Sequence, residues 1–214
     1  EDLTNLGRCL SLRRMHETEV SAAELFSGLC TEESHPLKVN LNELLTSYQK
    51  ESGIELAEEQ RFAIEAAAVG KCSVITGGPG VGKTTIVKAL CLVFKKAHMK
   101  IHLAAPTGRA AKRLSESTGR HATTLHRLLE FQPGGGGFEK NEEHPLDTDV
   151  LIVDEASMID IHLFRGIVAA LRTKAKLIFV GDIDQLPSVG PGSVLADIIA
   201  SNAASTWSSA TTSS

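Results

Sequence analysis

The chain has 214 residues, of which 42% are hydrophobic and 22% charged, and its formal net charge is -4. This composition is ordinary for a globular protein and excludes a disordered chain, a collagen-like fibre and a disulfide scaffold. No apolar run approaches the roughly 18 to 20 residues that a membrane helix needs, and residues 1–10 lack the layout of a secretory signal. The 4 cysteines lie far apart with no C-x-x-C pair, which favours reduced thiols in a cytoplasmic protein over a zinc site.

The average charge conceals a division along the chain. Residues 71–130 hold 11 Lys and Arg against 2 Asp and Glu, whereas the segments before and after them are acidic. A basic block between acidic flanks indicates a site for a polyanion whose field the flanks partly mask. On charge alone, a chance run of solvated lysines is an equal alternative.

The first seventy residues are expected to be helical. Apolar residues at helical spacing predict helices over about 17–29, 37–48 and 55–69, with Pro36 separating the first two. We therefore expect residues 1–54 to form a helical N-terminal segment, the end of a preceding domain. This segment by itself indicates no chemistry.

From Lys71 onward, short apolar strands alternate with helices, which predicts an α/β fold. Strands that are apolar throughout and separated by helices favour a parallel sheet with helices on both faces. Strands are expected at 72–76, 100–105, 150–154 and 176–181, and helices at 83–96, 109–117, 124–131 and 160–171.

Two further segments are expected to be irregular. The four consecutive glycines at 134–137 cannot hold a helix, and they predict a flexible connector or a hairpin tip. Residues 202–214 are mostly Ser, Thr and Ala around Trp207, which predicts a weakly structured, low-complexity tail.

Residues 77–84, Gly-Gly-Pro-Gly-Val-Gly-Lys-Thr, match G-x-x-x-x-G-K-[ST] between a predicted strand and a predicted helix. Glycines allow the backbone N–H groups to surround phosphates, and the helix adds the positive end of its dipole. Lys83 is expected to reach the β- and γ-phosphates of a nucleoside triphosphate, and the Thr84 hydroxyl to ligate Mg²⁺. The expected nucleotide-binding residues are Gly78, Pro79, Gly80, Val81, Gly82, Lys83, Thr84 and Thr85.

Polar residues follow two of the predicted strands, at the edge where α/β sheets bind ligands. Asp154 is expected to hold Mg²⁺ through water, and Glu155 to polarise the attacking water as general base. Gln185, together with Lys83, Asp154 and Glu155, completes the candidate catalytic set, because it could reach a γ-phosphate and sense its loss. The alternatives are a simple helix cap for the acidic pair and a solvated turn for Gln185.

Two segments of the basic block have the composition of a nucleic-acid contact. Residues 106–113 and 123–127 combine small hydroxyl residues with Arg, Lys and His, which suit a phosphodiester backbone. Only 4% of the residues are aromatic, so we expect binding through the backbone rather than extensive base stacking. The alternative is a helix whose arginines merely face solvent.

In this order, the segments resemble the first motor lobe of superfamily 1 DNA helicases, above all the RecD family. That family comprises the alpha subunit of exodeoxyribonuclease V and its stand-alone relatives. The resemblance runs from about Leu56 to Ser201 and includes Gln60 in L-A-E-E-Q, T-L-H-R-L-L and D-E-A-S-M. Its most specific strings are A-P-T-G-R-A-A-K-R-L at 105–114 and Q-L-P-S-V-G-P-G at 185–192.

The resemblance implies a RecA-like P-loop lobe over 55–201, with ATP and Mg²⁺ as cofactors. It further implies 5′–3′ movement on single-stranded DNA in recombination and repair, with nuclease and helicase subunits of exodeoxyribonuclease V as possible partners. By position, Gln60 would contact adenine and Gln185 the γ-phosphate. The implied strand-facing residues are Pro106, Thr107, Arg109, Thr124 and His126.

The sequence departs from the family pattern after the third motor motif. Family members continue into a second RecA-like lobe that supplies an arginine to the transferred phosphate, whereas no Arg or Lys follows Lys176 here. Such an arginine contributes about 10³ to 10⁵ in rate. We therefore expect a fragment that binds ATP, hydrolyses it poorly and does not unwind DNA alone. The alternatives are a P-loop ATPase of another class and a nucleotide-dependent assembly module.

Overall fold

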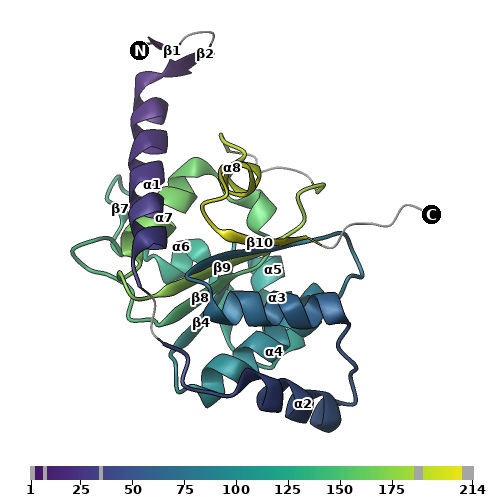
Figure 1. Ribbon diagram of the computed structural model, residues 1–214. Coiled ribbons are helices and arrows are strands. Elements are labelled where there is room, and N and C mark those ends of the chain that lie inside the picture. Colours follow the sequence, from purple (N-terminus) through teal and green to yellow (C-terminus); the bar gives the residue numbers. More distant parts are fainter. Residues whose placement is uncertain (1–2, 7–8, 34–35, 186–189, 209–214) are drawn as a thin grey trace.

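The computed structural model describes residues 3–6, 9–33, 36–185 and 190–208. Its centre is a 6-stranded sheet with the order β10-β3-β9-β8-β4-β5 (Figure 1). Every pairing within this sheet is parallel. The strands are β3 Cys72–Thr76, β4 Ile101–Ala105, β5 Ala122–Thr124, β8 Val150–Val153, β9 Lys176–Gly181 and β10 Ser205–Ser208.

Helices cover both faces of the sheet, as the uninterrupted apolar strands require. Because successive strand residues point to opposite faces, β8 divides its side chains between two clusters. Leu151 and Val153 pack with α1, α7 and α8, whereas Val150 and Ile152 pack with α2, α3 and α4. The helices are α1 Arg13–Thr31, α2 Leu41–Ser52, α3 Glu58–Val69, α4 Lys83–Lys96, α5 Gly108–Thr118, α6 Leu125–Leu128, α7 Ile161–Ala170 and α8 Val194–Ser201, with a short 3₁₀ turn, η1, at Ala156–Met158.

The predicted α/β class is therefore confirmed, but the N-terminal segment is not wholly helical. A short antiparallel hairpin of β1 (Leu3–Leu6) and β2 (Cys9–Leu12) precedes α1. The α1 helix packs lengthwise on α7 (Figure 1), with the Phe26 and Phe164 ring centroids 5.4 Å apart. Because Phe26 belongs to the buried core of the lobe, α1 is an integral part of this fold.

The prediction of a weakly structured tail is wrong for residues 205–208. These residues form β10, which pairs with β3. Trp207 is 8% exposed and belongs to the cluster beneath α3 and α4. One inward-facing aromatic side chain anchors an otherwise Ser- and Thr-rich strand at the edge of the sheet, which gives little periodic signal. Residues 209–214 lie outside the described part of the chain.

The predicted helix over 124–131 is also largely wrong. Residues 122–124 form β5, and only α6 is helical, with Glu130 in the left-handed region at φ 55°. Three of the four glycines, 134–136, do lie in the tip of a hairpin between β6 (Phe131–Gln132) and β7 (Gly137–Phe138), and Gly137 is the first residue of β7. Within the described ranges, no helix is both long and apolar enough to cross a membrane.

Candidate active site

The glycine-rich loop connects β3 to α4 and places its backbone at the end of the sheet. Gly80 and Gly82 both have φ 85°, a conformation that only glycine adopts readily. Gly82 directly precedes α4, so the positive end of the α4 dipole faces the loop. A Cβ atom added to Gly82 would collide with Nε2 of Gln60. A Cβ atom added to Gly80 would have no other atom within 4 Å.

Gln60 lies beside this loop and ties α3 to it. Its side-chain amide donates a hydrogen bond to the Val81 carbonyl at 3.0 Å, and its Oε1 accepts one from the Ala57 N–H at 3.2 Å. The amide therefore fixes the position of the loop relative to the start of α3. Contact with adenine remains a prediction.

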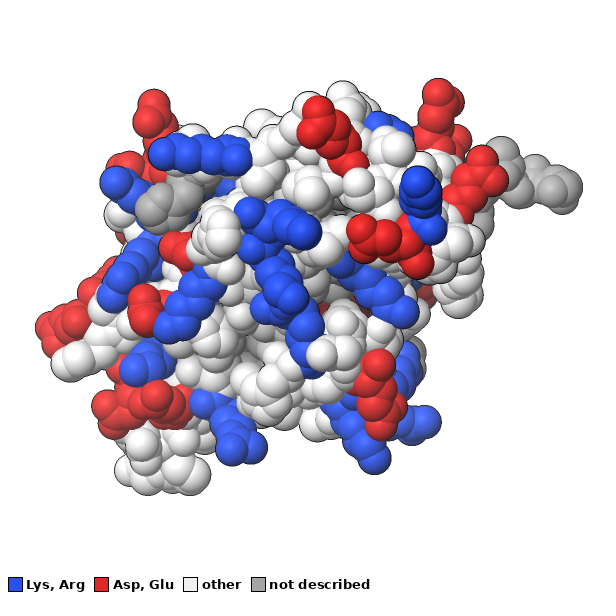
Figure 2. All heavy atoms as spheres, turned by 90° about the horizontal axis from the view of Figure 1, so that it is seen from below, with Lys and Arg blue, Asp and Glu red and all other residues white. Residues whose placement is uncertain are grey.

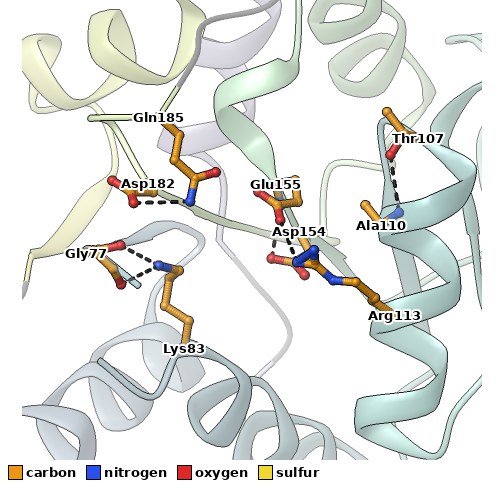
Figure 3. Close-up of polar contacts among 10 residues, drawn as sticks. Gly77, Lys83, Thr107, Ala110, Arg113, Asp154, Glu155, Asp182 and Gln185 are labelled. Carbon is orange, nitrogen blue, oxygen red and sulfur yellow. Dashed lines mark hydrogen bonds and ion pairs between the residues drawn. The ribbon is translucent and has the colours of Figure 1, made fainter. Parts of the chain in front are cut away.

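Lys83 in the first turn of α4 directs its ammonium group at the same loop (Figure 3). Its Nζ donates to the Gly78 carbonyl at 2.9 Å and also to the Gly77 carbonyl. The neighbouring Thr84 is exposed. A cation, a hydroxyl and a set of loop N–H groups thus lie together at one helix N-terminus, the arrangement that binds polyphosphates.

The loop forms one side of a cleft of about 380 Å³, and residues that follow β8 and β9 form another. Because β9 lies between β8 and β3, the carboxyl ends of all three strands meet at one edge of the sheet. Eight of the predicted site residues line the cleft: Pro79, Gly80, Gly82, Lys83, Thr84, Asp154, Glu155 and Gln185. Gly78, Val81, Thr85 and Gln60 are not among the residues that line the cleft.

Asp154 and Glu155 directly follow β8 and differ in their contacts. Burial raises the pKa of Asp154 above its ordinary value, while the Glu155 N–H, Arg113 and Lys83 act in the opposite sense. The Glu155 N–H donates to Asp154 Oδ1 at 3.0 Å. Glu155 has φ 54°, which is a strained conformation for a residue with a side chain and is typical of functional sites.

Gln185 follows β9 and also lines the cleft. Its amide donates to Asp182 Oδ2 at 3.2 Å, and Asp182 is 3% exposed. The buried carboxylate thereby holds the Gln185 amide at the cleft (Figure 3). Residues 186–189 of the Q-L-P-S-V-G-P-G string lie outside the described residues.

The five residues predicted to contact DNA lie at or just after the carboxyl ends of two neighbouring strands, β4 and β5. Ala105 of β4 pairs with Thr124 of β5, so the segments that follow both strands begin at one edge of the sheet. Thr107 caps α5 by accepting from the Ala110 N–H at 3.2 Å. Pro106 precedes it, and Arg109 and His126 are exposed. Figure 2 shows Lys and Arg side chains across the middle of one face, with Asp and Glu mostly toward its margin.

His126 has aromatic neighbours that the low aromatic content did not predict. Its ring centroid lies 5.4 Å from that of Phe131 and 6.0 Å from that of Phe138, both in the β6–β7 hairpin. Phe131 is 44% exposed. The hairpin therefore places an accessible aromatic surface beside the candidate strand contacts, where a base could stack.

Arg113 is a cleft residue that sequence reasoning missed. Its Nη2 lies 3.3 Å from Glu155 Oε1, across 42 positions of sequence. Figure 3 shows its side chain extending from α5 to the acidic pair. The sequence placed Arg113 in a basic helix, but no spacing rule connects that helix with the end of β8.

Comparison with known proteins agrees with this geometry. A family model described as an AAA domain matches residues 60–191. The chain is 44% identical over 137 residues to an ATP-dependent RecD2 DNA helicase of Deinococcus radiodurans, covering 64% of this chain and 19% of that protein. It is 43% identical over 165 residues to the RecBCD enzyme subunit RecD of Mycobacterium tuberculosis, and this match covers 66% of this chain and 28% of that protein.

Among solved structures, the Pif1 helicase of Candida albicans has a similar fold. The TM-score is 0.52 at 24% sequence identity, and the match covers 73% of this chain and 40% of that one. The chain thus spans about a fifth to two fifths of the relatives it matches. The matched region contains the loop, the acidic pair and the basic helix described above, and the chain belongs to the AAA domain family, with sequence similarity to RecD proteins over this region.

Proposed function

We propose that this chain is the ATP- and Mg²⁺-binding motor lobe of a cytoplasmic 5′–3′ helicase that acts on single-stranded DNA in recombination and repair. The observation that carries the proposal is the cleft, which brings Lys83 of the phosphate loop together with Asp154 and Glu155, the residues that follow β8. The basic helix α5 borders the same cleft through Arg113. Nucleotide chemistry and strand contacts therefore share one edge of the sheet.

The donor chemistry of the cleft fits Mg²⁺. Thr84 offers a hydroxyl and Asp154 a carboxylate, and Mg²⁺ prefers oxygen ligands of this kind together with phosphate oxygens and water. When bound, the ion would neutralise charge that develops on the transferred phosphoryl group. The pKa of Asp154, which burial raises, would fall beside a divalent cation, since an opposite charge favours the ionised carboxylate.

The remaining roles belong to the residues of the chain. The loop N–H groups and Lys83 would bind the phosphates and orient the terminal one. Glu155 would accept the proton of the attacking water, and Gln185, fixed by Asp182, would contact the terminal phosphate and respond to its loss. Gln60 would contact the adenine edge from its position beside Val81.

On the DNA side, Pro106, Thr107, Arg109, Thr124 and His126 would contact the strand backbone. Exposed Arg109 would supply a cation, and exposed His126 and the two threonine-capped helix starts would supply N–H groups, to strand phosphates. Association of the longer protein with nuclease and helicase subunits is the corresponding proposal for its partners.

We expect ATP turnover by this chain alone to be slow. The described lining of the cleft contains two cations, Lys83 and Arg113, and Glu155 engages Arg113. An arginine supplied from a second lobe typically adds about 10³ to 10⁵ in rate. The motor therefore depends on a cation from outside this cleft.

The test is ATP turnover measured with protein in excess, with and without oligo(dT) and with and without Mg²⁺. We expect slow, Mg²⁺-dependent turnover that DNA stimulates and that Lys83→Ala abolishes. Turnover that DNA leaves unchanged would indicate a P-loop ATPase of another class. ATP binding without turnover, even with DNA present, would indicate an assembly module.

A further inference from the structure

Arg113 connects the basic helix with the candidate general base. Its guanidinium lies 3.3 Å from Glu155 Oε1, and the side chains are 65% and 21% exposed, respectively. The ion pair thus has one accessible partner on α5 and one largely sheltered partner at the cleft (Figure 3). Arg113 lines the cleft, and its exposed side chain is also open to an anion from solvent.

The position of Arg113 on α5 places it close to the proposed strand contacts. Arg109 and Arg113 are four residues apart, so they lie on one side of the helix about one turn from each other. Thr107 caps the start of this helix. A DNA phosphate bound by Arg109 would therefore lie on the side of α5 that also carries Arg113.

The contact also affects what Glu155 can do. A carboxylate oxygen that accepts from a guanidinium is less available to accept a proton from water. Glu155 Oε1 is the oxygen that Arg113 contacts, and Glu155 lines the cleft. Removal of Arg113 from this oxygen would leave it free to accept the proton of an attacking water in the cleft.

We propose that Arg113 is a positioning residue for which the Glu155 carboxylate and a DNA phosphate compete, so that strand binding on α5 releases Glu155 at the cleft. The inference rests on the proposed function, because it requires that α5 contacts DNA. It goes beyond that function by naming the contact through which DNA binding would stimulate ATP turnover at the cleft. Since coupling is reciprocal, breaking the pair from the Glu155 side must strengthen DNA binding.

The coupling should be modest and measurable. A partly exposed ion pair changes an equilibrium by about two- to fivefold, which a strand phosphate can overcome. We therefore expect the pair to hold Glu155 when DNA is absent and to give way when DNA is bound. Breaking the pair should therefore change DNA affinity by about two- to fivefold as well.

The experiment is a double-mutant cycle read by fluorescence anisotropy of labelled oligo(dT), at low salt and without nucleotide. It compares the unmodified chain, Glu155→Gln, Arg113→Ala and the double variant. Glu155→Gln is expected to tighten oligo(dT) binding about two- to fivefold by freeing Arg113. In the Arg113→Ala background, which binds more weakly, Glu155→Gln is expected to have no effect.

Lys112 offers a matched control on the same helix. Its side chain is 79% exposed and pairs with Glu116 at 3.9 Å, away from the cleft. Lys112→Ala should weaken oligo(dT) binding through the lost charge but preserve the response to Glu155→Gln. In an Arg113→Lys background, which keeps the charge that Arg113→Ala removes, Glu155→Gln should still tighten oligo(dT) binding in part. Thermal melts of all variants would verify folding.

The outcomes separate the inference from the function on which it rests. If Glu155→Gln tightens binding equally in the Arg113→Ala background, removal of a negative charge explains the effect, and the competition is refuted. If Glu155→Gln changes nothing in the unmodified chain, the competition is refuted while DNA binding stands. If the unmodified chain does not bind oligo(dT), the proposed function fails, and the inference fails with it.

Discussion

Gly80 and Gly82 of the phosphate loop share a backbone conformation but differ in their surroundings. Both have φ 85°, yet a Cβ atom would meet nothing within 4 Å at Gly80 and would collide with Gln60 at Gly82. An alanine at either position is strained, but only at Gly82 must it also displace a neighbour. We therefore predict that Gly82→Ala destabilises the lobe more than Gly80→Ala.

The size of the difference follows from the contacts of Gln60. A left-handed conformation costs a residue with a Cβ about 1 to 2 kcal/mol, which applies to both variants. Displacing Gln60 also breaks its hydrogen bonds with Val81 and Ala57, each worth about 1 kcal/mol. The expected losses are therefore about 1 to 2 kcal/mol for Gly80→Ala and about 3 to 4 kcal/mol for Gly82→Ala.

Urea unfolding gives both free energies, and Gln60→Ala provides the decisive background. Once the Gln60 side chain is removed, an alanine at Gly82 has nothing to displace, so the two glycine variants should lose equal stability. Equal losses in the unmodified chain would refute the reasoning. So would a difference that persists in the Gln60→Ala background.

Two further predictions concern the edge strand and a buried lysine. Trp207→Ala should lower the free energy of unfolding by about 3 kcal/mol in urea, because Trp207 anchors β10 in the core; an unchanged midpoint would contradict this packing. Burial lowers the pKa of Lys176 to about 8, so the unfolded chain binds more protons above that pH, and stability should rise toward pH 10. Between pH 8 and 10, the free energy of unfolding of the unmodified chain should rise by about 2 to 3 kcal/mol relative to that of Lys176→Met. A difference between the two proteins that does not change over this range would contradict the prediction.

The parts of the fold that sequence predicts well are those with strong local signals. The strand β8 is a continuous apolar run, β3 and β9 are apolar at most positions, and the glycine motif locates both the loop and the start of α4. Because parallel strands align their carboxyl ends, the residues after β8 and β9 were expected to meet the loop. The cleft contains them, although their individual chemical roles stay predictions.

The parts that sequence misses depend on contacts between distant segments. The β10 strand has one inward-facing aromatic residue, and its pairing with β3 rather than its own pattern makes it a strand. The hydrogen bond from Gln60 to Val81 spans 21 positions, and the ion pair from Arg113 to Glu155 spans 42. Neither follows from helical or strand spacing, because the topology of the sheet sets both distances.

Isothermal titration of ATP into the chain in the presence of Mg²⁺ tests the central claim most directly. The account predicts saturable binding to the unmodified chain that Lys83→Ala weakens about tenfold or more, since charge-assisted hydrogen bonds to phosphate are lost. It also predicts weaker binding when Mg²⁺ is withheld. Binding of equal strength by the unmodified chain and by Lys83→Ala would contradict the assignment of this cleft as the nucleotide site.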